Sequence, residues 1–211
     1  LGRTRYFCGF SNSNYFSLYV FSFSVLFFFL KRNKKSLFIS IIILFGTTFF
    51  TGSRTPLYSF VIFLLLCPFF KKGNIKFKQG LGFFLVIIIL IAYIYFSLNY
   101  EKFVVLDILL SHRLLLINRF INDLSLKEIL VGGNNPTFPI DNSYLRFLMH
   151  YGILFLLGFL CVLFFKIRNN NYDHIESAFV ITMLAFGIFE SVLISPGIPV
   201  SILFWYLILL K

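Results

Sequence analysis

The stretch LGFFLVIIILIAYIYFSL, residues 81–98, decides the fold class of this chain. It holds no charged residue, and its only polar groups are those of tyrosine and serine. A helix needs about 20 predominantly apolar residues to cross the hydrocarbon core of a bilayer. A soluble core does not require so long an uninterrupted apolar run. The stretch therefore predicts a membrane-spanning helix.

The rest of the chain follows the same pattern. Its residues are 59% hydrophobic and 13% charged, whereas soluble domains carry about 25% charged residues. The sequence predicts an all-α, polytopic transmembrane helix bundle that forms a single membrane domain over 1–211. We expect this domain to be the C-terminal part of a longer protein, because the chain starts at Leu1 with polar and basic residues. Seven apolar segments are predicted to span: 15–30, 37–51, 56–70, 81–98, 143–165, 177–194 and 199–210.

Basic loops set the expected orientation. KRNKK at 31–35, KKGNIKFK at 71–78 and KIRNNNYDH at 166–174 are rich in lysine and arginine. Such loops stay on the cytoplasmic side of a membrane. Residues 99–142 then form a long extracytoplasmic loop. The net charge of +11 is not interpreted as nucleic-acid binding, because the charges flank the apolar segments in short clusters.

The predicted outer face is rich in arginine rather than lysine. Arginine binds phosphate or carboxylate through two parallel hydrogen bonds, which lysine cannot do. An outer anion site is therefore predicted, although arginines that reach from the bilayer to the interface are the alternative for some of them. Gly52 and Pro56 around Arg54 favour a rigid turn that displays this side chain. The outer arginines are Arg3, Arg5, Arg54, Arg113, Arg119 and Arg146.

The long loop contains LDILLSHRLLLINRFINDL, residues 106–124, whose apolar spacing fits an amphipathic helix. This helix is expected to lie along the membrane or to cap the bundle. His112 and Arg113 fall on its early turns, with Arg113 near the apolar border. Gly132 and Gly133 follow a second short helix, and they favour a plain turn over a phosphate-binding turn of exposed amides.

A polar cluster stands where the loop meets the fifth apolar segment. Asp141, Asn142 and Ser143 can each cap the helix that follows. Asn142, Arg146 and His150 are four residues apart and would form one stripe; His150 is interpreted as a packing residue. Glu190, in the sixth segment, is expected to pair with an outer arginine or to orient a substrate. No cysteine and histidine spacing resembles a metal site, so we expect neither metal nor cofactor.

Taken in order, these motifs resemble the bacterial O-antigen and capsular polysaccharide polymerases (Wzy type) of the O-antigen ligase and polymerase superfamily. RYFCGFSNSNYFS, residues 5–17, resembles the family's arginine, Gly-Phe pair and asparagine at a helix head. TGSRTP at 51–56 resembles its Ser-Arg turn. SHRLLLINRF at 111–120, with LVGGN at 130–134, resembles its outer-loop arginine and Gly pair. DNSYLRFLMHYG at 141–152 resembles its Asn-x-Tyr-Leu helix start.

The resemblance implies a metal-independent, GT-C-like membrane glycosyltransferase in the bacterial cytoplasmic membrane. Such an enzyme polymerises oligosaccharide repeat units linked to undecaprenyl pyrophosphate. It implies a chain-length regulator protein as a further partner, besides the lipid bilayer and the lipid-linked oligosaccharide, and no nucleic acid. Arg54, Arg113 and Asp141 are the expected catalytic residues: the arginines would neutralise the departing diphosphate and Asp141 would be the base. The expected substrate-binding residues are Arg3, Arg5, Asn14, His112, Asn142, Tyr144, Arg146 and Glu190.

Asp141 also marks a departure from the related ligases, which carry histidine just before the asparagine. This difference favours a polymerase and leaves His112 and Glu190 open as alternative bases. A ligase that transfers a finished glycan is one alternative function. A flippase or transporter for a lipid-linked sugar is another, but it should place charges near the bilayer midplane and show paired repeats, which the sequence lacks. A scaffold without chemistry would leave the outer arginines unexplained.

Overall fold

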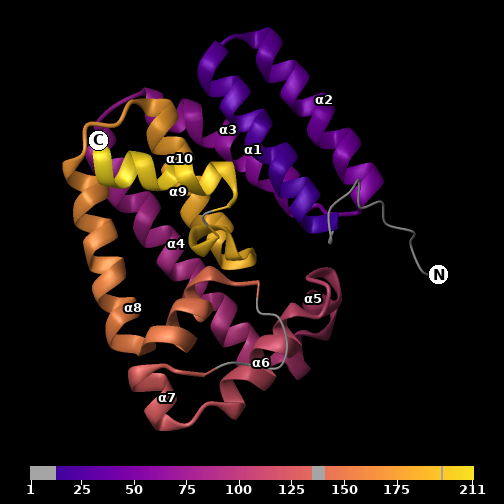
Figure 1. Ribbon diagram of the computed structural model, residues 1–211, viewed down its shortest axis with the longest axis vertical. Helices are drawn as coiled ribbons and strands as arrows, with labels where there is room; N and C mark the ends of the chain where they lie inside the picture. Colours follow the sequence, from indigo (N-terminus) through magenta and orange to yellow (C-terminus); the bar gives the residue numbers. More distant parts are fainter. Residues whose placement is uncertain (1–12, 135–140, 196) are drawn as a thin grey trace. The chain divides into compact units, whose positions relative to one another are not determined.

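The computed structural model describes residues 13–134, 141–195 and 197–211, with side chains from Phe16 onward (Figure 1). All regular elements among these residues are helices, as predicted. The α-helices are α1 Ser13–Lys31, α2 Lys34–Thr51, α3 Thr55–Lys71, α4 Ile75–Leu98, α5 Val104–Leu109, α6 Arg113–Asp123, α7 Leu126–Val131, α8 Ser143–Asn169, α9 His174–Phe189 and α10 Pro199–Leu210. Short 3₁₀ helices are η1 Tyr100–Phe103 and η2 Ser191–Ile194.

Each of the seven predicted apolar segments is a helix, namely α1, α2, α3, α4, α8, α9 and α10. Within the described part of the chain, α2, α4 and α8 are long and apolar enough to cross a membrane. Helices α3, α9 and α10 are apolar but shorter, and so is Phe16–Lys31, the part of α1 whose side chains are described. These lengths indicate a membrane protein, while a topology of seven crossings stays a prediction.

The structure divides into two compact units, while the single membrane domain expected from the sequence stays a prediction. Unit 1 comprises residues 1–75, 170–186 and 192–211, and unit 2 comprises residues 76–169 and 187–191. Each unit is described here by itself.

Aromatic rings and small hydroxyls hold unit 1 together. The Phe29 ring packs edge-on against Phe179, with centroids 5.3 Å apart, which joins α1 to α9. The Ser17 hydroxyl donates to Thr51 Oγ1 over 3.2 Å and so joins α1 to α2. The Tyr19 hydroxyl donates to the Gly197 carbonyl over 2.8 Å. Small hydroxyls at helix contacts allow the close approach that is typical of helices packed in membranes.

Unit 2 is built on α4 and α8, with the segment between them packed as short helices. The Phe83 and Phe164 rings lie 5.4 Å apart and join α4 to α8. On α6, Leu114, Ile117 and Phe120 are buried, and these positions lie on one face of a helix. The predicted amphipathic face therefore exists on α6, where it covers part of the core of unit 2.

Helix α8 is broken at Gly152, which adopts φ 78° and ψ 174°. Figure 1 shows a short helical piece, residues 143–151, that turns into the long piece, residues 153–169. The Phe147 ring lies 4.4 Å from the Phe159 ring, whereas residues twelve apart in a straight helix are separated by about 18 Å along the axis. The chain therefore folds back at this glycine. The expectation of one continuous helical span from 143 to 165 is wrong, whereas Asn142, Arg146 and His150 all precede the break.

Helix α7 packs its last residues against this break. A Cβ atom on Gly152 would lie 2.2 Å from the Leu130 carbonyl oxygen, and one on Gly132 would lie 2.5 Å from the Tyr151 nitrogen. The Asn134 amide also donates to the Met149 carbonyl over 3.1 Å. At both glycines the backbone of α7 and its end lies directly against the backbone of α8. A side chain at position 132 or 152 would therefore not fit. Gly132 thus makes a packing turn, while the His150 side chain, interpreted from the sequence as a packing group, is exposed.

Candidate functional site

The site in unit 2 starts from a turn that the buried carboxylate of Asp107 organises. Its Oδ1 accepts hydrogen bonds from the Leu114 and Leu115 amides over 2.9 and 3.1 Å. Its Oδ2 lies 3.1 Å from His112 Nδ1. Ser111 and His112 both have left-handed backbone angles, with φ of 58° and 62°. The predicted helix over 106–124 is therefore two helices, α5 and α6, because Asp107 binds the free amides at the start of α6.

Sequence reasoning missed Asp107. An acid a few residues before a helix start is a signal for capping, but here the apolar periodicity continues across the turn and hides the break. His112 is placed beside this acid with its side chain 65% exposed. The imidazole ring of His112 thus contacts the Asp107 carboxylate, and the rest of the ring is exposed to solvent.

Asp107→Ala is expected to loosen the turn that positions Arg113. The substitution removes an acceptor from two backbone amides and from His112, at a cost of about 1–3 kcal/mol for each buried donor left unsatisfied. Protease cleavage of the purified protein at the α5–α6 turn should become faster. Asp123→Ala is the control, since Asp123 is exposed at the end of α6; equal cleavage of both variants would contradict the role given to Asp107.

Arg113 lies at the centre of the site, with its side chain 21% exposed. Its Nη2 lies 3.0 Å from Glu190 Oε1 and 3.7 Å from Asp141 Oδ2. Its Nη1 donates to the Phe189 carbonyl. Arg113 was expected near the apolar border of its helix, and in the structure its guanidinium is mostly buried beside Glu190.

Glu190 is buried, at 5% exposure, and stands between the last residue of α9 and the first of η2. The sequence placed it inside the sixth apolar segment, but α9 ends at Phe189, one residue earlier. Its side chain pairs with Arg113. The structural reading of Glu190, an ion pair with an arginine of the predicted outer set, is therefore confirmed.

The start of α8 fixes the position of Glu190. The side-chain amide of Asn142 donates to the Ile188 carbonyl over 2.7 Å, and the Ser143 hydroxyl donates to the Glu190 backbone carbonyl over 2.8 Å. Asn142 Oδ1 also accepts the Leu145 amide over 2.9 Å, which is the geometry of an N-cap. Of the three residues that could cap this helix, Asn142 makes the side-chain cap. Asp141 keeps a carboxylate that is 44% exposed, beside Arg113.

The Arg113 guanidinium lies between the carboxylates of Glu190 and Asp141. Burial alone would lower the pKa of Arg113, but the Glu190 carboxylate, with a smaller contribution from Asp141, raises it. Arg113 therefore stays charged. Its partner Glu190 is nearly enclosed, whereas Asp141 is the more distant and the more exposed of the two carboxylates.

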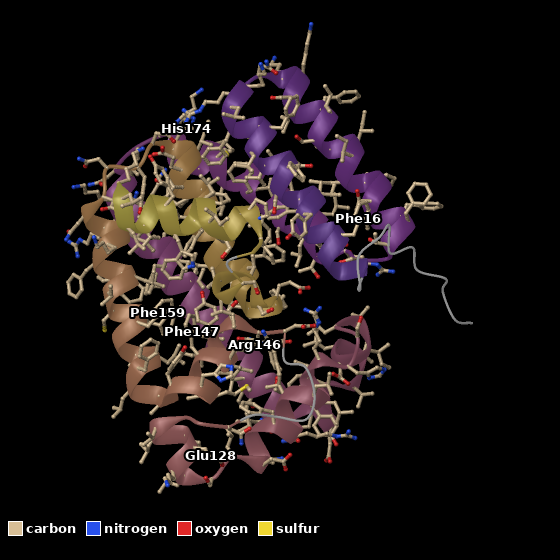
Figure 2. The ribbon with its side chains drawn as sticks, in the orientation of Figure 1. Phe16, Glu128, Arg146, Phe147, Phe159 and His174 are labelled. Carbon is tan, nitrogen blue, oxygen red and sulfur yellow. The ribbon has the colours of Figure 1, made fainter. Side chains whose placement is uncertain are left out.

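The other predicted site residues are placed as follows. Arg146 is half-buried on the short piece of α8, next to Phe147 (Figure 2). The Tyr144 side chain is 1% exposed, so it lies in the core rather than at a surface that a substrate could reach. Arg54 belongs to unit 1, where it is exposed at the N-cap position of α3.

The turn that displays Arg54 has the predicted form. Gly52 ends α2 in the left-handed conformation, with φ 69°, and Pro56 occupies the first turn of α3. Arg3 and Arg5 lie outside the described residues, and Asn14 lies in the first turn of α1, before the first described side chain. Among the described residues, no three histidine, cysteine, aspartate or glutamate side chains gather as metal ligands would.

Comparison with known proteins gives no relative. No family model, no curated protein and no solved structure matches this chain.

Proposed function

We propose that this protein is a multi-pass glycosyltransferase of the bacterial cytoplasmic membrane. It polymerises oligosaccharide repeat units carried on undecaprenyl pyrophosphate, and it does so on the outer face. The observation that supports the proposal is the Arg113–Asp141 pair: a partly exposed carboxylate lies 3.7 Å from a charged guanidinium. Glycosyl transfer from a diphosphate needs a cation for the leaving group and a base for the attacking hydroxyl.

Arg113 has the role of diphosphate ligand. Two of its N–H groups bind Phe189 and Glu190, and this fixes the plane of the guanidinium. The remaining N–H groups can meet phosphate oxygens in a bidentate geometry. Asp141 lies farther from Arg113 than Glu190 does. Its carboxylate moves away from Arg113 when the phosphate of the donor binds there.

The single positive charge of Arg113, which already lies beside two carboxylates, cannot neutralise the negative charge of a diphosphate. The reaction needs further positive charge, and we propose Arg54 for this role because it is exposed and stands in the turn that resembles the family's Ser-Arg motif. Arg3, Arg5 and Arg146 are further candidates. Arginine in these places stabilises the negative charge that grows on the departing diphosphate.

Asp141 has the role of base. It accepts the proton of the acceptor hydroxyl while the hydroxyl oxygen bonds to the anomeric carbon of the donor sugar. The bond from that carbon to the diphosphate oxygen breaks, and undecaprenyl pyrophosphate leaves with the electron pair. The attack needs no metal ion in this scheme, because Arg113 and the further arginines named above supply the positive charge.

Asp141→Asn tests the base directly, because Asn142 and not Asp141 caps α8. The variant keeps the cap and the shape of the side chain but cannot take a proton. We expect long-chain polysaccharide to disappear, while the protein still inserts and single repeat units accumulate on the lipid carrier. The measurement is the chain-length distribution of extracted polysaccharide on a gel, in a strain that carries the complete protein.

Asp123→Asn is the matched control, since Asp123 is an exposed acid on α6 in the same segment. It should leave chain length unchanged. Normal chain lengths from Asp141→Asn would show that Asp141 is not the base. Accumulation of finished polymer on the lipid carrier, instead of single units, would indicate a ligase.

A further inference from the structure

Helix α5 exposes its apolar residues and buries its acid. Asp107 is 4% exposed, while Val105 is 74%, Ile108 58% and Leu109 71% exposed. A short helix in water would show the opposite arrangement, because burying apolar side chains is favourable and burying a carboxylate is costly. The outward face of α5 therefore suits an apolar environment.

Helix α7 also exposes apolar side chains. None of its residues is buried, and Leu126, Leu130 and Val131 are 75%, 44% and 67% exposed. The Glu128 carboxylate is engaged within the segment, where it accepts from the Ser125 amide and from the Asn134 side chain, each over 2.8 Å. The Glu128 carboxylate is thus paired with residues that flank α7, while Leu126, Leu130 and Val131 are exposed.

Helix α6, between them, has the ordinary arrangement. It buries Leu114, Ile117 and Phe120 and exposes Arg119, Asn122 and Asp123. The apolar exposure is therefore a property of α5 and α7 and not of the whole segment from α4 to α8.

Both helices adjoin the outward surfaces of helices long enough to cross a membrane. Helix α5 follows α4 through η1, where the Phe103 ring packs 4.7 Å from Phe96, and Leu98 at the end of α4 is 47% exposed. Helix α7 docks on the break of α8 at Gly152, beside Tyr151 and Leu154, which are 54% and 71% exposed. The apolar faces thus continue surfaces of α4 and α8.

We propose that α5 and α7 bind the phospholipid bilayer at the level where α4 and the long piece of α8 leave it. Val105, Ile108 and Leu109 of α5, and Leu126, Leu130 and Val131 of α7, enter the boundary between headgroups and acyl chains. Exposed lysines flank both faces, Lys102 before α5 and Lys127 on α7. Their ammonium groups reach the headgroup phosphates, as amphipathic interfacial helices require. The segment between α4 and α8 is thereby held against the membrane, independently of the reaction proposed above.

Tryptophan fluorescence tests this proposal, because the chain holds a single tryptophan, Trp205. A Trp205→Phe background receives Val105→Trp or Leu126→Trp, one at a time, and Asn122→Trp on the polar face of α6 is the control. The complete protein, with any tryptophan outside residues 1–211 also replaced by phenylalanine, is reconstituted in phosphatidylethanolamine and phosphatidylglycerol vesicles whose acyl chains carry bromine near the headgroup. Size-exclusion profiles select variants that keep the fold.

Brominated lipid is expected to quench the tryptophans at 105 and 126 several-fold more than the one at 122. Acrylamide in the water should show the reverse order. Equal acrylamide quenching at all three positions would place the two faces in water and overturn the proposal. Protection from both quenchers would show a protein partner or a second copy over the face, which also overturns it. Contact with lipid at one position alone overturns the assignment of the other helix.

Discussion

Gly152→Ala is expected to destabilise the protein severely and to misplace the start of α8. Gly152 has φ 78°, and an added Cβ would lie 2.2 Å from the Leu130 carbonyl oxygen and 2.5 Å from its carbon. A backbone with φ 78° and ψ 174° is adopted essentially by glycine alone and costs another residue about 1–3 kcal/mol, and overpacking adds about 1–3 kcal/mol. The neighbours are backbone atoms, which cannot move aside as a flexible side chain would. Thermal unfolding in mild detergent, followed by size exclusion, measures the loss.

Gly158→Ala is the matched control on the same helix. Nothing lies within 4 Å of a Cβ at Gly158, and alanine is a better helix former than glycine by about 1 kcal/mol. This variant should be as stable as the parent or slightly more stable. Gly132→Ala should behave like Gly152→Ala, because its Cβ would meet His150 and Tyr151 backbone atoms at 2.5 Å. Equal stability of the alanine variants at 152 and 158 would contradict the packing described here.

The seven helices of the apolar segments could be predicted because each run is long and apolar, and a backbone in lipid has to satisfy its own hydrogen bonds. The break in α8 could not. Glycine is common in membrane helices, so Gly152 in an apolar run gives no sign of a turn. The turn depends on Leu130 and Val131 of α7, which approach from a distant part of the sequence. Gly152 makes a close backbone contact, while nothing lies within 4 Å of a Cβ at Gly158.

The polar residues of the site could be named from the sequence, but their partners could not. Asp141, Asn142 and Ser143 are all good capping residues, and only the geometry selects Asn142. Glu190 could be expected to pair with one of the outer arginines, since a charge in an apolar setting needs a partner, but only the structure selects Arg113. Asp107 was missed because its neighbours repeat at helical spacing. The turn at Ser111 and His112 depends on the hydrogen bonds of that single carboxylate.

Arg113→Ala is expected to abolish long-chain polysaccharide and also to destabilise unit 2. It removes the cation that pairs with the buried Glu190 carboxylate, and breaking a buried pair from one side costs about 3–5 kcal/mol. Arg119→Ala controls for the loss of one positive charge, since Arg119 is exposed on the same helix; it should leave both stability and chain length unchanged. Arg113→Lys should retain stability better than alanine but make little long polymer, because lysine lacks the planar fork.

The double substitution Arg113→Gln with Glu190→Gln separates the two effects. It removes both charges together, so no carboxylate is left buried without its cation, and replacing a whole buried pair is often nearly neutral for stability. We expect this variant to fold and insert but to make no long polymer. Arg54→Ala should give the same polysaccharide pattern with unchanged stability, since Arg54 is exposed. Normal chain lengths from both variants, on a gel of extracted polysaccharide, would exclude a diphosphate role for these arginines and leave the Arg113–Glu190 pair as a structural link between α6 and the end of α9.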